Sequence, residues 1–487
     1  MKRQAKRILL PCLEVTEIAF PTDENAIPIY LREGNPNPDY YVRNKHENPT
    51  GERIDFKPRW MGSRFNLFPI VLDAHGVPWA EANIYLLSRA ESTPNPVMST
   101  LASIADSLAS FRRFLDETGI DWTEFPSQKL KRPTYRYSSY LKLEIASDHL
   151  KDSTAKRHMS TVISFYSWLI QENTLKPAHS PWKKDDRFIQ LTDRRGLKFS
   201  KQISTTDLSI KTAKPNDPYS DQIEDGGKLR PLNTADQEHL IEALIELGNT
   251  EMLLIHLVGL LTGARIQTVL TMRLKHVSAK LKNATSDEIR VPAGPGTGID
   301  TKYGKKLVLH FPKWLYEKLH IYANSNRSKL RRLRAGNGDN ADQYLFLSIR
   351  GVPLYTSKQD SLMFDSSNNK RHIKNGQAVR QFIKDYVIPL IRLKKKDDNF
   401  QYQFHDTRAS YGMNLTDHQL KRVSLGEITL HQAREFVKAR MGHESSATTD
   451  KYLQYRSNLH MASAINATYQ NHIQNLIAKY TIGKNEN

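Results

Sequence analysis

Two short polar clusters close to the C-terminus constrain this chain more than any other feature. The first is His405-Asp406-Thr407-Arg408, and the second is Gly442-His443, followed nine positions later by Tyr452. A tyrosine hydroxyl has a pKa near about 10, so it becomes a nucleophile at neutral pH only where cations and a proton acceptor favour its phenolate. Arginine supplies such a cation, and its planar fork matches two phosphate oxygens. We therefore expect a fold in which the two clusters meet around one phosphate.

Two elements upstream complete a pattern. Thr262-Gly263-Ala264-Arg265 places an arginine directly after an apolar run, and Lys302 lies in a lysine-rich segment between two predicted strands, 288–292 and 306–311. In this order, the set resembles the C-terminal signature of the tyrosine recombinase (phage integrase) family. Each motif is weak alone, whereas the ordered set is specific.

The resemblance implies a site-specific DNA recombinase or integrase, the strand-exchange enzyme of a mobile genetic element. It implies that Tyr452 attacks a DNA phosphodiester to form a 3′-phosphotyrosine, and that Lys302 protonates the departing 5′ oxygen. The residues implied to stabilise the transition state or to shuttle protons are Arg265, His405, Arg408 and His443. Because the covalent link conserves the bond energy, we expect no cofactor, neither ATP nor a metal ion.

Several alternatives stay open at this stage. Lys305 and Lys306 compete with Lys302 as the general acid, and Tyr455 is the rival nucleophile, three residues beyond Tyr452. Where the family usually has an acidic residue three positions after its first arginine, this chain has Thr268. A type IB topoisomerase would use a similar residue set, and a DNA-binding protein of the same fold without catalysis is the other alternative.

The charge balance points to a polyanionic partner. The 487 residues include 71 Lys and Arg against 52 Asp and Glu, a formal charge of +19. Neutralising phosphates releases condensed counterions, so such an excess favours binding to nucleic acid or to an anionic membrane. Double-stranded DNA is the partner that the resemblance implies.

Other classes of function are less compatible with the sequence. Cys12 is the single cysteine, which excludes an intramolecular disulfide, and no Cys/His spacing of a metal site occurs. The longest apolar run, 252–261, is far shorter than the roughly 20 residues of a membrane span. The glycine-rich stretch 294–298 lacks the pattern of an ATP-binding loop. We expect a cytoplasmic protein without a membrane segment.

The periodicity predicts a mainly α-helical fold with a small β-sheet or hairpin. We expect an N-terminal extension over 1–95, which is β-rich or contacts DNA through interleaved basic and aromatic residues, and a helical domain over 96–176. The latter resembles the SAM-like core-binding domain of the family. A basic linker or insertion is expected over 177–227, the catalytic domain over 228–460 and a helical tail over 461–487.

Two segments exceed what the family pattern needs. The segment 324–375 contains a basic run, interpreted either as a helix along the DNA backbone or as an exposed insertion, and 417–435 must loop out for His443 to reach the phosphate. By resemblance, the tail docks on a neighbouring protomer, which implies a homotetramer on DNA, with accessory DNA-bending proteins as further partners. The alternative is that the tail packs on its own domain.

Overall fold

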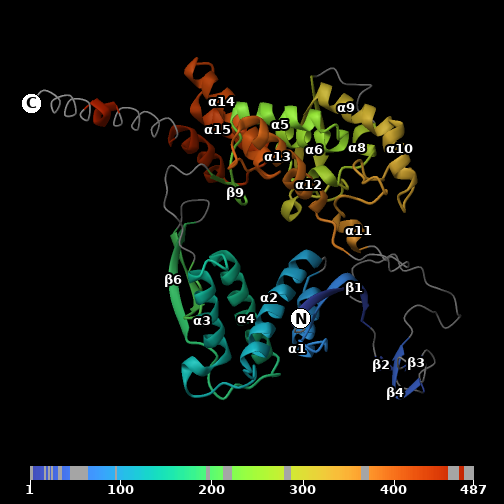
Figure 1. Ribbon diagram of the computed structural model, residues 1–487, viewed down its shortest axis with the longest axis vertical. Helices are drawn as coiled ribbons and strands as arrows, with labels where there is room; N and C mark the ends of the chain where they lie inside the picture. The colour runs from blue at the N-terminus through green and yellow to red at the C-terminus, as the bar shows by residue number, and fades with distance from the viewer. Residues whose placement is uncertain are drawn as a thin grey trace, which may run out of the picture. The chain divides into compact units, whose positions relative to one another are not determined.

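Helices and small antiparallel sheets of two or three strands make up the described parts of the chain, which confirms the predicted fold class (Figure 1). The computed structural model describes residues 4–15, 18–19, 22, 26–30, 36–43, 64–93, 96–192, 198–211, 222–278, 287–362, 372–458 and 471–475. The chain divides into two compact units, the first comprising Met1–Lys214 and Asp360–Ile373 and the second Pro215–Gln359 and Lys374–Asn487. Among the described residues, no helix combines the length and the apolar character needed to cross a membrane.

The first unit combines a helical bundle with strands that are paired antiparallel. Its elements are β1 (Lys6–Glu14), β2 (Ile18–Ala19), β3 (Ala26–Tyr30), β4 (Pro36–Arg43), β5 (Arg64–Leu72), α1 (Ala80–Glu91), α2 (Met98–Thr118), η1 (Lys129–Lys131), α3 (Pro133–Ala146), α4 (Asp152–Gln171), β6 (Lys184–Thr192) and β7 (Lys198–Thr206). Strand β1 pairs with β5, and both pack on α2. The described part of 1–95 thus contains the strands β1 to β5 and helix α1.

Aromatic side chains fill the core of the first unit. Trp79 contacts Phe165 edge to face, with ring centroids 5.3 Å apart, and Phe111 contacts Tyr137 at 4.9 Å. These rings come from α2, α3, α4 and the residue before α1. Apolar residues recur in α2 and α4 at three- and four-residue steps, so they form one face of each helix, and these faces pack together.

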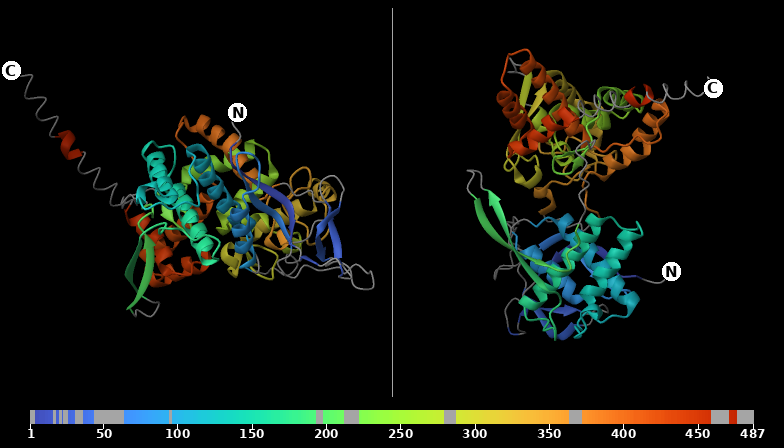
Figure 2. Two further views of the ribbon diagram at one scale, coloured as in Figure 1. Left: turned by 90° about the horizontal axis from the view of Figure 1, so that it is seen from below. Right: turned by 90° about the vertical axis from the view of Figure 1, so that its left-hand side faces the viewer.

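The segment 177–227, expected to be an extended connection or an inserted element, contains a β-hairpin. Strands β6 and β7 pair in register from Lys184↔Thr206 to Thr192↔Lys198. Both views of Figure 2 show this hairpin, drawn in green, extending beyond the helices of the same unit. A second, much shorter hairpin follows at the start of the second unit and is formed by β8 (Ile223–Glu224) and β9 (Lys228–Leu229).

The second unit contains further elements, which include the apolar helix α6 and the elements around it. They are α5 (Thr234–Glu246), α6 (Thr250–Thr262), α7 (Ile266–Leu270), α8 (Lys275–Ser278), β10 (Glu288–Ala293), η3 (Lys302–Gly304), β11 (Leu307–Pro312), α9 (Lys313–Asn324), α10 (Asn326–Leu333), α12 (Gln377–Phe382), the π-helical turn η4 (Ile383–Val387), α13 (Ile388–Lys395), α14 (Asp406–Ser424) and α15 (Leu430–Met441), with α11 (Lys358–Leu362) at the boundary between the units. A further helix covers 446–458.

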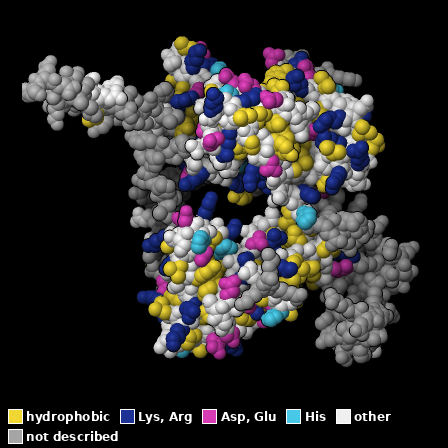
Figure 3. Space-filling view, viewed as in Figure 1, with side chains coloured by type: hydrophobic (Ala, Val, Ile, Leu, Met, Phe, Trp, Pro, Cys, Tyr) yellow, Lys and Arg dark blue, Asp and Glu magenta, His cyan; other side chains and the backbone are white. Residues whose placement is uncertain are grey.

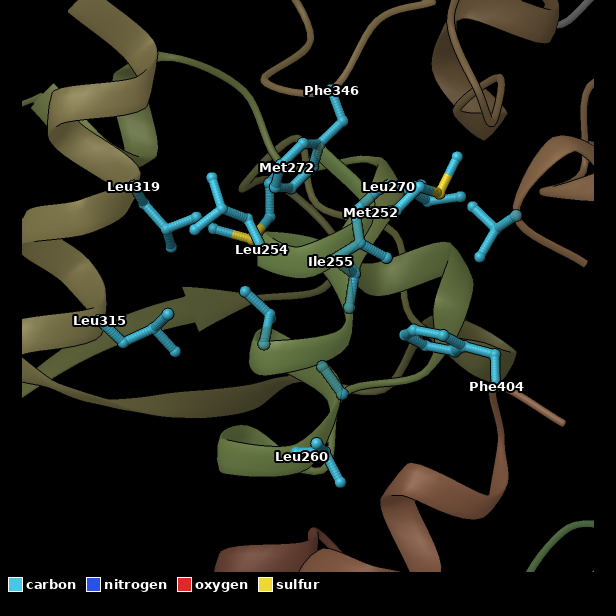
Figure 4. Close-up of a cluster of buried hydrophobic side chains, with 14 of the residues drawn as sticks. Met252, Leu254, Ile255, Leu260, Leu270, Met272, Leu315, Leu319, Phe346 and Phe404 are labelled. Carbon is cyan, nitrogen blue, oxygen red and sulfur yellow. The ribbon is translucent and has the colours of Figure 1, made fainter. Parts of the chain in front are cut away.

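Helix α6 is apolar on most of its surface and is therefore buried. Figure 4 shows Met252, Leu254, Ile255 and Leu260 of α6 among side chains from neighbouring elements. Burying one such side chain stabilises the fold by about 1.5–3 kcal/mol. The C-terminal end of α6 is thereby fixed in place, and it carries the first predicted site arginine.

Two expectations about the longer segments are corrected by the structure. The residues 417–435 do not loop out, because they form the last turns of α14, a short connection and the first turns of α15. The basic run within 324–375 forms α10 and is not simply an exposed insertion, because three of its arginines pair with carboxylates of the same chain. Glu251 accepts hydrogen bonds from Arg327 at 2.7 and 2.8 Å and pairs with Arg331 at 3.0 Å, while Arg332 pairs with Asp339 at 2.6 Å.

Candidate active site

The ends of three helices and the middle of a fourth carry most of the predicted site residues, in one region of the second unit. Helix α6 ends at Gly263, whose φ of 64° is the left-handed conformation of a helix C-cap, and Arg265 follows. His405 is the N-cap of α14, so Arg408 lies in its first turn. Helix α15 ends at Gly442, also with a φ of 64°, directly before His443. Tyr452 lies in the helix that covers 446–458.

Helices α6 and α14 approach each other closely at a glycine. A Cβ atom built on Gly259 would lie 2.6 Å from the Thr407 hydroxyl, which is far inside van der Waals contact. Since only glycine permits this approach, Gly259 allows the first turn of α14 to pack beside the end of α6. The two arginines at these helix ends are thereby brought to the same place.

One carboxylate lies where these side chains converge, and it belongs to Asp225 in the turn of the β8–β9 hairpin. Its Oδ2 accepts hydrogen bonds from Arg408 Nε at 2.7 Å, from the Tyr452 hydroxyl at 3.1 Å and from His443 Nε2 at 3.3 Å. Its Oδ1 accepts a bond from Arg265 Nη2 at 3.3 Å. Four of the six predicted residues therefore bind a single anionic group.

Arg408 is held rigidly in this arrangement. Its Nη1 donates to the Gly263 carbonyl at 2.9 Å, and its Nη2 donates to the Met441 carbonyl at 2.8 Å. The guanidinium thus connects the C-terminal ends of α6 and α15 while its Nε faces the anion. Fixed donors of this kind stabilise charge without reorganising.

Lys302 reaches the same hairpin, whereas Lys305 points elsewhere. Lys302 lies in the loop between β10 and β11, and its Nζ donates to the Gly226 carbonyl at 3.2 Å. Lys305 pairs with Glu444 at 2.9 Å. This placement favours Lys302 over Lys305 as the cation of the site.

Charge and burial set the protonation states of the site. Burial alone would raise the pKa of Asp225, but the hydrogen bond from His443 and the charge of Arg408 hold the pKa well below its usual range, so the group is ionised. Burial, followed by the charges of Arg265 and Arg408, lowers the pKa of His405 to about 4. Burial also lowers the pKa of His443, despite its bond to Asp225. Both histidines are therefore neutral at pH 7 and able to accept a proton.

Tyr452, rather than Tyr455, places its hydroxyl at the anion. Its ring stacks on His443 with centroids 5.7 Å apart, and the side chain is buried. Burial and the negative charge of Asp225 raise its pKa above the ordinary value for tyrosine. With Asp225 in place, the hydroxyl is therefore protonated and weakly nucleophilic.

Two buried polar atoms beside the carboxylate have no hydrogen-bond partner among the described residues. They are His405 Nε2 and Arg265 Nε. A pocket of about 30 Å³ lies beside Arg265 and is also bordered by Lys302, Arg408 and Gly442. Such a volume holds about two waters.

Asp225 was not predicted from the sequence. The sequence showed only that Thr268 replaces the acidic residue expected after the first arginine, and that a buried arginine needs an anion. Thr268 is buried in α7, and Arg265 donates to the Asp225 carboxylate, which lies 40 positions before it in the chain.

Solved structures similar to this chain are those of DNA-bound integrases. A lambda integrase(75-356) dimer bound to a COC′ core site has 13% sequence identity and a TM-score of 0.41, with 77% of this chain and 95% of that chain covered. The Tn1549 transposon integrase in complex with circular intermediate DNA has 13% identity and a TM-score of 0.42, with coverage of 78% and 99%. Its complex with transposon right end DNA has 13% identity and a TM-score of 0.41, with coverage of 79% and 99%.

No protein-family model and no curated protein match the sequence. The structural comparison returns integrases, the family that the motifs resemble. Because these TM-scores lie under 0.5, the functional conclusion rests on the geometry of the site.

Proposed function

We propose that this chain is a site-specific DNA recombinase or integrase that cuts and rejoins strands through a 3′-phosphotyrosine. The observation that carries this proposal is the convergence of the Tyr452 hydroxyl with Arg265, Arg408 and His443 on one anion-binding position. A nucleophile, two fixed guanidinium groups and a neutral imidazole are the groups that a phosphoryl transfer requires.

In the proposed reaction, a DNA phosphate takes the position at which these side chains converge. The Tyr452 oxygen attacks phosphorus, and its proton passes to one of the neutral imidazoles of His405 and His443. The bond from phosphorus to the 5′ oxygen breaks, and the Lys302 ammonium supplies the proton that this oxygen needs. The two arginines bind the non-bridging oxygens throughout. The phosphotyrosine retains the energy of the broken bond, so religation calls for no ATP.

The proposed partner is double-stranded DNA, which the helices of 96–176 and the catalytic region of 228–460 would each contact. The solved integrases to which the chain is similar are bound to DNA. On the face shown in Figure 3, Lys and Arg side chains mix with Asp and Glu. We also propose a cytoplasmic location and a homotetramer on DNA. The tail expected to join the protomers, 461–487, lies almost wholly outside the described residues.

A second candidate function is DNA binding without cleavage. The burial of Tyr452 and the raised pKa of its hydroxyl favour it, because both reduce the nucleophilicity of this group in the conformation described.

A search for a covalent protein–DNA adduct separates the two candidates. The wild type, Tyr452→Phe and Tyr455→Phe would be incubated with DNA flanking the gene and analysed on a denaturing gel. We expect an adduct with the wild type and Tyr455→Phe, and none with Tyr452→Phe. Loss of the adduct in Tyr455→Phe alone would move the nucleophile to that residue. Equal DNA binding by all three proteins with no adduct in any would establish the non-catalytic function.

A further inference from the structure

The turn of the β8–β9 hairpin contacts five of the six residues proposed to act on DNA. Asp225 binds Arg265, Arg408, His443 and Tyr452, and the neighbouring Gly226 carbonyl accepts the bond from Lys302. A Cβ atom on Gly226 would lie 3.0 Å from Lys302 Nζ, so the turn lies tightly against this lysine. Asp225 and Gly226 together therefore contact nearly every residue of the site.

The position of the carboxylate distinguishes two roles for Asp225. A supporting acid would bind the arginines from behind and leave their substrate-facing side open. Here Oδ2 lies 3.1 Å from the Tyr452 hydroxyl and 2.7 Å from Arg408 Nε, between nucleophile and guanidinium. Reacting atoms lie about 3–3.5 Å apart before attack, so this oxygen occupies the place that a phosphate must take. The carboxylate resembles a phosphate in charge and in its pair of oxygens.

The hairpin is attached to the nucleophile helix in two further ways. Glu224 pairs with Lys451 at 3.0 Å, one residue before Tyr452. The buried Ile223 packs in the same small cluster as Tyr452 and Met441. Only two residue pairs hold the strands together, Ile223↔Leu229 and Glu224↔Lys228. A hairpin this short is marginally stable by itself, so it can leave the site without unfolding the surrounding helices.

We propose that the β8–β9 hairpin is an autoinhibitory plug, in which the Asp225 carboxylate holds the phosphate position of the DNA-free protein and leaves when a duplex binds. This inference rests on the proposed function, because it takes the occupied position to be that of the DNA phosphate. It also accounts for the raised pKa of Tyr452, since the hairpin both buries the hydroxyl and places a negative charge beside it.

The first test needs no DNA and uses inorganic phosphate as the probe. Thermal unfolding would be followed with increasing phosphate at constant ionic strength, for the wild type, Asp225→Asn and the double variant Asp225→Asn with Arg408→Ala. An anion that binds only the folded state raises the Tm. We expect phosphate to raise the Tm of Asp225→Asn by several degrees, and to leave the wild type and the double variant unchanged. An unchanged Tm of Asp225→Asn would overturn the inference.

A second variant keeps Asp225 and loosens the plug. Glu224→Lys places a cation beside Lys451, and Glu246→Lys is its matched control, because Glu246 forms a similar exposed ion pair with Lys394 at 2.6 Å. We expect Glu224→Lys to form the covalent DNA adduct several-fold faster than the wild type at subsaturating DNA, and Glu246→Lys to match the wild type. If Asp225 were instead a positioning residue, Glu224→Lys would form the adduct no faster than the wild type. Asp225→Asn would then form the adduct more slowly than the wild type even at saturating DNA.

The two measurements separate a failure of this inference from a failure of the proposed function. A phosphate response in Asp225→Asn without any DNA adduct would support the plug and refute cleavage. An adduct in the wild type, with no phosphate response and no faster cutting in either hairpin variant, would support cleavage and refute the plug.

Discussion

His256 makes the stability of the second unit depend on pH. It is fully buried in α6, where its Nδ1 donates to the Met252 carbonyl at 2.7 Å and its Nε2 accepts from the Tyr402 hydroxyl at 2.9 Å. This assignment of donor and acceptor is the one that a neutral ring satisfies. Burial lowers the pKa of the imidazole from 6.5 to about 4.

The direction and the size of the effect follow from linkage. The unfolded chain takes up this proton near pH 6.5 and the folded chain only near pH 4. The stability that comes from keeping His256 neutral in the folded chain is therefore complete above pH 6.5 and is lost progressively as the pH falls toward 4. Between pH 8 and pH 5 the loss from this one group is about 2 kcal/mol, because one pKa unit corresponds to about 1.4 kcal/mol.

Hydrogen exchange measured by mass spectrometry can follow this loss in α6 itself, separately from the first unit. The opening free energy of Thr250–Thr262, corrected for the intrinsic exchange rate, would be compared at pH 8 and pH 5 in the wild type and in His256→Gln. We expect its decrease from pH 8 to pH 5 to be about 2 kcal/mol smaller in His256→Gln than in the wild type. His431→Gln, at an exposed position of α15, is the control and should follow the wild type. The reasoning is wrong if His256→Gln and the wild type lose the same amount.

Three further substitutions test the framework of the site. Glu251→Gln leaves the buried Arg331 without its counter-charge and should destabilise the protein by about 3–5 kcal/mol, whereas Lys329→Ala, on the exposed side of α10, should leave the Tm unchanged. Thr429→Ala removes the capping box of α15 and should destabilise by about 1 kcal/mol in denaturant unfolding. Gly263→Ala puts a Cβ atom 2.5 Å from the Tyr411 ring at a φ of 64°, so it should lower both the Tm and the yield of DNA adduct.

Sequence patterns were informative where structure depends on neighbours along the chain. The glycine after the apolar run of α6 caps that helix, and the predicted strands 288–292 and 306–311 correspond to the paired strands β10 and β11. The order of the motif residues likewise led to six positions that the structure places in one region. Their roles stay predictions until the Tyr452→Phe adduct test.

Long-range electrostatic pairing was not readable from the sequence. The basic run of α10 was interpreted as a DNA-binding or exposed segment because charged side chains usually face solvent. Its partner Glu251 lies 76 residues before Arg327, and no local rule connects the two. Asp225 presents the same difficulty, since it lies in a turn between two-residue strands that show no periodicity. A buried arginine such as Arg265 requires an anion beside it, but the sequence does not show which acidic residue supplies that anion.

The exchange of Asp225 for a DNA phosphate leaves the charge of the site unchanged, because each group carries one negative charge. The site alone therefore gives DNA no electrostatic advantage, and the carboxylate of the same chain competes intramolecularly with the DNA phosphate. A duplex gains its advantage from phosphates bound outside the site, whose binding releases counterions. Adduct formation by the wild type should consequently fall steeply with salt, whereas phosphate binding by Asp225→Asn, a single-anion event, should fall only slightly. Equally shallow salt dependences would mean that contacts outside the site do not drive the displacement of Asp225.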